Sequence, residues 1–210
     1  MNPLETETIE LLSAAATPRP LFVLLHDEGG VAADMLALGN LLGDAFADAA
    51  VLMPEGLVGP RPAAGAGNDQ GGMSARVEAL AAFVRAQQQR FGVLQSDTAL
   101  AGFGAGASLA LALSDAHDGL VGRVLAFGGG YAVWPAKAPL LTTLHLLHGQ
   151  NDQVVPVARV REGFDCLMAL GADATLDVAA SLGHELHPAL MDQAVMRLQT
   201  CVPLRHWKAV

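Results

Sequence analysis

The stretch that decides the fold is residues 98–114, which read Thr98-Ala-Leu-Ala-Gly102-Phe103-Gly104-Ala105-Gly106-Ala107-Ser108-Leu-Ala-Leu-Ala-Leu-Ser114. A short apolar run leads into closely spaced glycines, and apolar residues at helical spacing follow them. This order predicts a strand, a sharp turn and a buried helix. The turn at 102–107 is therefore the first place to look for a functional site.

Two kinds of site use a strand, a turn and a helix in this order. One is the nucleophile elbow G-x-S-x-G, in which the turn lifts a serine above the sheet, and here glycine occupies position 104 in place of that serine. The other is the dinucleotide fingerprint G-x-G-x-x-G/A, which Gly102, Gly104 and Ala107 satisfy. That fingerprint needs an acidic residue after the next strand, but residues 127–130 read Phe-Gly-Gly-Gly, so we expect no nicotinamide, flavin or other cofactor.

Outward from this stretch, strand-like and helix-like segments alternate along the whole chain. Residues 4–12 fit a strand or a helix equally well, and residues 55–72 form a long loop rich in glycine and proline. The alternation predicts an α/β fold of three layers, with a mostly parallel sheet between helices, as one domain over residues 1–210. The predicted strands are 21–25, 50–53, 123–127, 141–147 and 175–178, the predicted helices are 35–42, 73–91, 157–168 and 189–198, and one further strand and helix lie within 98–114.

The composition excludes several classes of partner. With 210 residues and 52% hydrophobic residues the chain can fill one core, and its net charge of −9 disfavours binding to nucleic acid. No apolar run approaches the ~20 residues of a membrane span, and acidic residues stand where a signal peptide carries basic ones. Cys166 and Cys201 make no disulfide framework. We therefore expect a cytoplasmic protein, monomer or homodimer, with a small-molecule partner.

Three loops supply the parts of an acyl-transfer site. Ligands of parallel sheets bind at the carboxyl ends of the strands, so the loops that follow strands matter most. The elbow at 102–106 comes first, Asp152 follows in the loop 148–156, and His184 follows in the loop 181–188. Nucleophile, acid and histidine in this order are typical of α/β-hydrolases, in which the acid orients the histidine that takes the nucleophile's proton.

The chain resembles the carboxylesterase/phospholipase family of small α/β-hydrolases, especially its bacterial esterase branch. The resemblance implies cleavage of small acyl esters or thioesters, with Asp152 as the triad acid and His184 as the base. It also implies an oxyanion hole formed by the backbone N–H groups of Glu28 and Ala105. The segments that carry the resemblance are 24–26 with the glycines that follow, 102–106, 123–132, 144–149 with Asp152, and 175–178 with 182–184.

The chain departs from the family pattern where the reaction takes place. The family carries serine at position 104 and usually glutamine at 105, and its first loop reads His-Gly-apolar-Gly where this chain has Asp27 and Glu28. No acyl-enzyme can form at Gly104, because it has no nucleophilic atom. One hypothesis is a hydrolase that uses Asp152, His184 and a water bound above Gly104; the other is an inactive pseudoenzyme that binds a small ligand or a partner.

Other side chains could replace the missing serine. Glu28 is a candidate carboxylate nucleophile or base if it reaches His184. Ser108 is expected in the packing between helix and sheet, and Ser74 is expected to cap the helix that follows the long loop. Asp27, Glu28, His184 and His187 could together be considered for a metal, but the His-Glu-Leu-His run lacks the H-E-x-x-H spacing, so we expect no metal.

Overall fold

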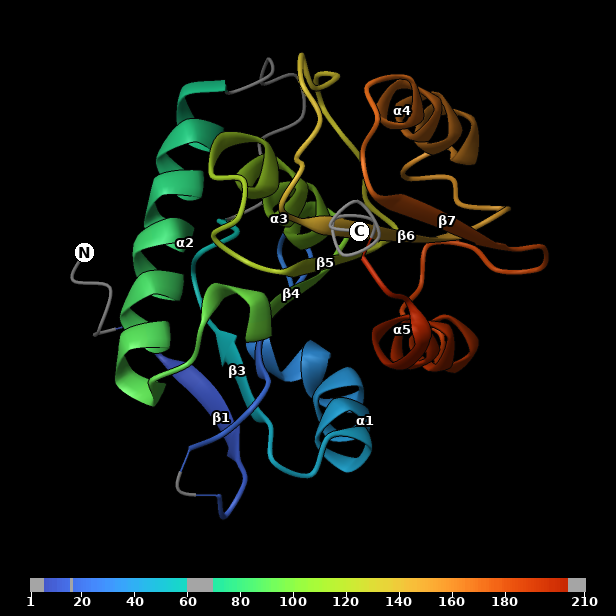
Figure 1. Ribbon diagram of the computed structural model, residues 1–210. Helices are drawn as coiled ribbons and strands as arrows, with labels where there is room; N and C mark the ends of the chain where they lie inside the picture. The colour runs from blue at the N-terminus through green and yellow to red at the C-terminus, as the bar shows by residue number, and fades with distance from the viewer. Residues whose placement is uncertain (1–5, 16, 60–69, 204–210) are drawn as a thin grey trace.

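The computed structural model describes residues 6–15, 17–59 and 70–203. Residues 4 and 5 of the first predicted segment and residues 60–69 of the long predicted loop lie outside the described residues. Within the described residues the centre of the fold is a seven-stranded sheet in the order β1-β3-β2-β4-β5-β6-β7 (Figure 1). The strands are β1 Thr8–Leu12, β2 Leu21–Leu25, β3 Ala50–Pro54, β4 Thr98–Phe103, β5 Arg123–Phe127, β6 Thr143–Gly149 and β7 Ala174–Ala179.

The sheet is parallel except at one edge. β1 pairs antiparallel with β3, so the segment 4–12, which fitted strand or helix, forms an edge strand. All other neighbouring strands pair parallel. β2 and β4 lie side by side in the middle of the sheet, and every residue of β2 is buried, as a central strand covered on both faces requires.

Helices cover both faces of the sheet (Figure 1). On one face, α2 (Gln70–Phe91), α3 (Ala105–Ala116) and α4 (Val157–Ala169) enclose a core that includes Leu21, Val23 and Leu25 of β2. On the other face, α1 (Leu36–Ala45) and α5 (Pro188–Thr200) enclose a core that includes Phe22 and Leu24. Successive β2 residues point to opposite cores because side chains alternate along a strand. The predicted three-layer α/β architecture is confirmed.

Several boundaries differ from the predicted ones. α2 begins at Gln70, three residues before the predicted start, so Gly71 and Gly72, two of the glycines that suggested a loop, lie in a helix. β6 begins at Thr143, and the predicted strand residue Leu141 is exposed. The Asp118 carboxylate accepts hydrogen bonds from the N–H groups of Leu140 and Leu141, which therefore do not pair with a strand. Two short 3₁₀ turns precede α1 and β4, at Ala32–Met35 and Gln95–Asp97.

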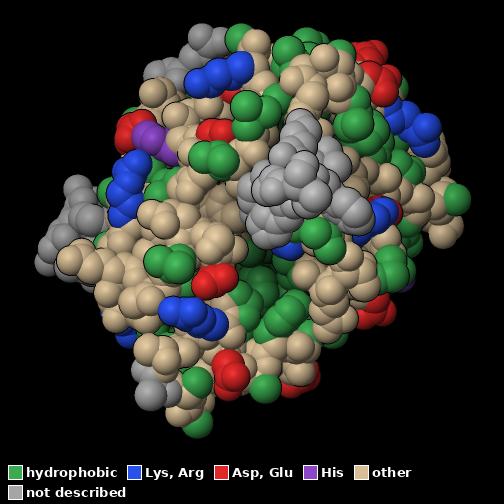
Figure 2. All heavy atoms as spheres, viewed as in Figure 1, with side chains coloured by type: hydrophobic (Ala, Val, Ile, Leu, Met, Phe, Trp, Pro, Cys, Tyr) green, Lys and Arg blue, Asp and Glu red, His purple; other side chains and the backbone are tan. Residues whose placement is uncertain are grey.

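The outer surface shows how charge is distributed. On the face drawn in Figure 2, lysine and arginine side chains stand apart from one another among acidic and uncharged groups. None of the described helices combines the length and the continuous apolar character that crossing a bilayer would demand.

Candidate active site

The turn between β4 and α3 keeps the shape of a nucleophile elbow. Gly104 has φ 54° and ψ −113°, a conformation that L side chains adopt only under strain. Its N–H donates to the carbonyl of Phe127 on the neighbouring strand, over 2.9 Å. At Gly106 an added Cβ would overlap the backbone carbonyl oxygens of Leu25 and His26, so glycine lets α3 begin directly against the end of β2. The predicted strand, turn and helix are confirmed.

The space above Gly104 is filled by the carboxylate of Asp27. Asp27 follows β2 by two residues, and its Oδ1 accepts a hydrogen bond of 2.7 Å from the N–H of Ala105. A Cβ at position 104 would overlap Oδ1 and Cγ of Asp27. A side chain at 104 and the Asp27 carboxylate in this position therefore exclude each other. The sequence-based expectation of a water above Gly104 is wrong, because the carboxylate occupies that place.

His184 and Asp152 lie together beside this carboxylate. The distance between His184 Nδ1 and Asp152 Oδ2 is 2.8 Å, and the Asp152 side chain is fully buried. Asp152 Oδ1 accepts hydrogen bonds from the N–H groups of Val154 and Val155, each over 2.8 Å. These two bonds fix the carboxylate within its own loop, and its other oxygen remains directed at the histidine. The sequence predicted that these two loops meet, and they do.

The second ring nitrogen of His184 faces Asp27. His184 Nε2 lies 3.4 Å from Asp27 Oδ2, and the ring packs against Phe103 with a centroid separation of 4.7 Å. Asp152, His184 and Asp27 therefore form a continuous polar chain that ends at the N–H of Ala105. In this chain the Asp27 carboxylate stands where the resemblance places a serine hydroxyl.

The charges in this chain restrict what the histidine can do. Carboxylates accept hydrogen bonds and do not donate them, so both contacts of His184 are hydrogen bonds only when both ring nitrogens carry protons. The 3.4 Å contact to Asp27 is at the long end of the hydrogen-bond range, whereas the 2.8 Å contact to Asp152 is close to ideal. The Asp152 contact therefore sets the orientation of the ring.

His148 supports the Asp152 loop, a role that the sequence did not reveal. Its Nε2–H donates to the carbonyl of Val155 over 2.8 Å and lies 3.4 Å from Asp152 Oδ2. Burial lowers the pKa of His148. The residue is the last but one of β6, just before the loop that carries Asp152. A histidine near the end of a strand carries no sequence signal that separates such a supporting contact from ordinary core packing.

The other predicted candidates lie apart from this chain. The carboxylate that approaches His184 belongs to Asp27, so the hypothesis that Glu28 supplies it is wrong. Ser108 Oγ donates to the Gly104 carbonyl and accepts from the N–H of Gly130, which uses it within the helix and sheet packing as expected. Ser74 lies inside α2 and does not cap it, because the helix begins at Gln70. The His187 side chain caps α5 by accepting from the N–H of Ala189.

The two predicted oxyanion-hole donors differ in occupancy. The Ala105 N–H already donates to Asp27. Within the described part of the chain, the Glu28 N–H has no hydrogen-bond acceptor. An anion that entered the site would therefore find one donor available and one taken by a carboxylate of the protein.

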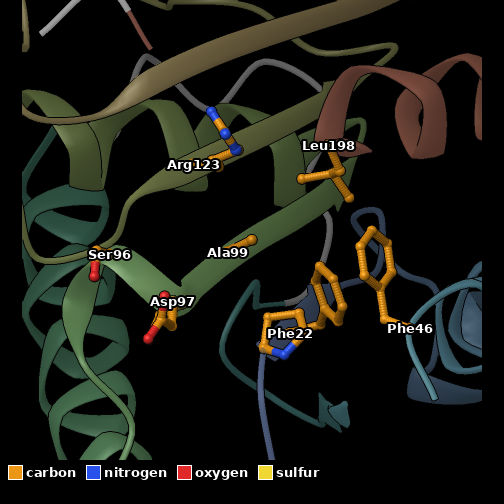
Figure 3. Close-up of a pocket in the computed structure, with 9 residues that line it drawn as sticks. Phe22, Phe46, Ser96, Asp97, Ala99, Arg123 and Leu198 are labelled. Atoms are coloured by element: carbon orange, nitrogen blue, oxygen red, sulfur yellow. The ribbon is translucent and has the colours of Figure 1, made fainter. Parts of the chain in front are cut away.

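Small cavities adjoin the elbow. One of ≈130 Å³ is lined by Glu28, Val58, Met73, Arg76, Ala105, Ser108 and Leu109. A second, of ≈220 Å³, lies beside Ser108, Gly130 and Tyr131. A third pocket lies at the opposite end of the sheet, where Phe22, Ala99 and Arg123 are the first or second residues of their strands (Figure 3). Only the first two adjoin the loops that bear the polar chain.

Comparison with known proteins places this geometry in a family. The profile of the phospholipase/carboxylesterase family matches residues 59–202. Esterase YpfH of Escherichia coli (strain K12) is 34% identical over 197 residues, which cover 89% of this chain and 85% of that protein.

Solved structures of similar fold agree with this assignment. The crystal structure of esterase PE8 superposes with a TM-score of 0.80 at 26% identity, over 94% of this chain and 99% of that one. The Bacillus cereus carboxylesterase has the same TM-score at 18% identity, over 94% and 95% of the two chains, and at that identity it shows the fold alone. With an α/β-hydrolase sheet and a family profile that spans more than half of its length, the chain belongs to the phospholipase/carboxylesterase family.

Proposed function

We propose that this chain is a hydrolase of small acyl esters or thioesters in which the Asp27 carboxylate replaces the serine hydroxyl beside His184. One observation supports the proposal above all: the carboxylate bridges the Ala105 N–H and His184 Nε2 directly over Gly104. Asp152 orients the His184 ring, and Asp27 gives the second ring nitrogen of His184 a carboxylate partner at the elbow. Asp27 is 24% exposed and His184 is 14% exposed, so both side chains are within reach of a small molecule.

The absence of an acyl-serine sets the character of the reaction. Serine esterases form an acyl-enzyme that accumulates when a good leaving group departs quickly. Gly104 cannot form one. Hydrolysis must instead use water or the carboxylate as the attacking group, with His184 as proton acceptor held by Asp152. The tetrahedral anion would receive a hydrogen bond from Glu28 N–H but would compete with Asp27 for Ala105 N–H, which predicts slow turnover without a burst.

A second candidate function is a pseudoenzyme that binds a small ligand. The observation in its favour is that the Asp27 carboxylate blocks the site. It fills the place of the nucleophile, occupies the Ala105 N–H of the oxyanion hole and faces His184. A carboxylate at the first N–H of a helix is also stabilising, because the helix N-terminus carries a partial positive charge. In that case Asp27 would stabilise the start of α3, and the cavity at Glu28 and Ala105 would bind a small ligand without converting it.

The test is steady-state hydrolysis of p-nitrophenyl acetate. We expect turnover above the buffer rate, linear from the first turnover, and unaffected by a fluorophosphonate that labels catalytic serines. His184→Ala and Asp27→Asn should each lower the rate by about 10²-fold, the usual size of a general acid–base contribution. His117→Gln is the matched control, because this histidine pairs with Glu78 on the surface, and it should retain the wild-type rate.

Two results would decide against the proposal. A wild-type rate equal to that of both site variants would show that Asp27 and His184 do not catalyse ester hydrolysis. If, in addition, small acyl compounds raise the melting temperature of the wild type, the pseudoenzyme is the correct function. A burst of p-nitrophenol that persists in the Asp27→Asn variant would show that a side chain other than Asp27 forms an acyl-enzyme.

A further inference from the structure

The two oxygens of Asp27 are placed differently, and this difference suggests a second chemistry. Oδ1 is held at 2.7 Å by the Ala105 N–H, whereas the one polar contact of Oδ2 with the described residues is the long 3.4 Å contact to His184. A carboxylate is a nucleophile through either oxygen, and the less tightly held oxygen is the more available one. Asp27 therefore presents Oδ2 to the site, whereas Oδ1 stays hydrogen-bonded to the backbone N–H of Ala105.

Attack by this carboxylate suits a saturated carbon better than a carbonyl carbon. Attack at a carbonyl develops an anion on the substrate that needs N–H donors, and the Ala105 N–H is already engaged. Attack at a saturated carbon develops no such anion, because the negative charge departs with the leaving group. The product of that attack is an ester of Asp27, whose carbonyl oxygen is Oδ1 and is already in contact with the Ala105 N–H.

From this arrangement we infer that the chain also hydrolyses small alkyl electrophiles, such as primary alkyl bromides, through a covalent alkyl ester on Asp27. The inference rests on the proposed function, since it uses the same carboxylate and histidine. It adds a class of substrate and a covalent intermediate that the family resemblance does not imply.

The first half of the reaction forms the intermediate. A lone pair of Asp27 Oδ2 bonds to the carbon, and the carbon–bromine bond breaks with its electron pair leaving on bromide. No proton is needed, because bromide is a stable anion. The cavity beside Glu28 and Ala105 offers apolar walls at Val58, Met73 and Leu109 for the alkyl chain, and Arg76, which lines the same cavity, brings a positive charge near the departing anion. Its volume of ≈130 Å³ limits the substrate to a few carbon atoms.

The second half returns the free enzyme. Alkylation neutralises Asp27, so His184 is left with one charged partner, Asp152, and can accept a proton at Nε2. Water gives that proton to His184 while its oxygen bonds to Asp27 Cγ, and the negative charge on Oδ1 faces the Ala105 N–H. The Cγ–Oδ2 bond then breaks, and the departing alkoxide takes the proton from His184 to give the alcohol. The Asp27 carboxylic acid finally releases its own proton to solvent.

The experiment removes the base so that the intermediate accumulates. His184→Gln is incubated with 1-bromobutane and analysed by intact-mass and peptide mass spectrometry. We expect one butyl group per chain, located on Asp27. The double variant Asp27→Asn/His184→Gln should carry none, whereas Asp44→Asn/His184→Gln should carry as much as His184→Gln, because Asp44 is an exposed carboxylate on α1.

The wild type gives a second readout that does not depend on trapping. In a single turnover in H₂¹⁸O, the butanol should contain ordinary oxygen, and the heavy oxygen should appear in Asp27. Heavy oxygen in the first butanol would show direct attack by water and would overturn the inference. So would butyl groups spread over surface carboxylates of His184→Gln, or none at all in a variant that melts like the wild type.

The two proposals can fail separately. Ester hydrolysis that depends on Asp27 and His184, without any alkyl ester on Asp27, would leave the hydrolase in place and remove this inference. If neither ester hydrolysis nor an alkyl ester on Asp27 is detected, Asp27 only blocks the site.

Discussion

At positions 27 and 104, one carboxylate and one missing side chain are complementary. The Asp27 carboxylate lies where a Cβ of residue 104 would be, so the two positions can hold Asp and Gly together but not Asp and a larger residue in this arrangement. Gly104 also removes the backbone strain that a side chain would suffer at φ 54°. The combination brings an oxygen atom to His184 from the loop after β2 rather than from the elbow.

Adding one methyl group at position 104 tests this complementarity. Gly104→Ala should lower the free energy of unfolding by about 2 kcal/mol, because alanine is strained at positive φ and displaces the Asp27 carboxylate from the Ala105 N–H. The matched control is Gly43→Ala in α1, where an added Cβ meets open space. That control should be neutral or stabilising, since alanine favours helix over glycine. Urea unfolding measures both, and equal effects at the two sites would contradict the packing described.

The sequence predicted part of this site and missed the rest for a physical reason. Asp152 and His184 could be placed because each follows a strand, and strand ends of a parallel sheet meet at one edge. Asp27 and Glu28 are adjacent in a loop, and the sequence-based hypothesis named Glu28 as the carboxylate that reaches His184, whereas it is Asp27 that turns inward. That choice depends on side-chain direction and on the space that Gly104 leaves open, neither of which is visible in a pattern of residue types.

At the scale of elements, the loops on both sides of His184 are anchored. Before it, the N–H of Asn151 donates to the Leu182 carbonyl over 2.8 Å, which joins the Asp152 loop to the His184 loop. After it, Arg197 of α5 makes two hydrogen bonds of 2.7 and 2.9 Å to the Asp177 carboxylate of β7. The hydrogen bonds to Asp177 raise the pKa of Arg197. His184 is therefore held between two fixed segments.

The same scale shows what hydrophobic spacing can predict. The continuous apolar run of β2 and the helical spacing of α4 appear where the sequence places them. Boundaries are less well predicted, because they depend on single hydrogen bonds. β6 starts late because Asp118 takes the preceding N–H groups, and α2 starts early despite its glycines.

At the scale of the whole molecule, a buried histidine links stability to pH. His145 lies in β6 with none of its surface exposed, and its Nδ1 is 2.9 Å from Thr175 Oγ1. Burial lowers the pKa of His145 to about 4. The unfolded chain binds a proton there near its ordinary value of 6.5 and the folded chain does not, so the folded state loses stability as the pH falls from about 6.5 to about 4.

Unfolding at several pH values measures this contribution. Above pH ~6.5 both states are neutral at His145, so the residue has no effect on the pH dependence. Between pH ~6.5 and ~4 the loss should grow to about 3 kcal/mol, and below that it should grow no further, because the folded chain is then protonated as well. In His145→Gln this part of the pH dependence should vanish. An unchanged pH profile in the variant would show that His145 is accessible to protons in the folded chain.

The central claim is that the Asp27 carboxylate occupies the place of the elbow nucleophile. The most direct measurement removes the Asp27 side chain and restores a serine at position 104. A fluorophosphonate probe is applied to the wild type, Gly104→Ser and Asp27→Gly/Gly104→Ser, and the labelled residue is identified by mass spectrometry. The account predicts no label on the wild type, little on the single variant because Asp27 still competes for the same space, and one label per chain on residue 104 of the double variant. Labelling of the single variant as fast as the double variant would contradict it, because the carboxylate would then not occupy that space.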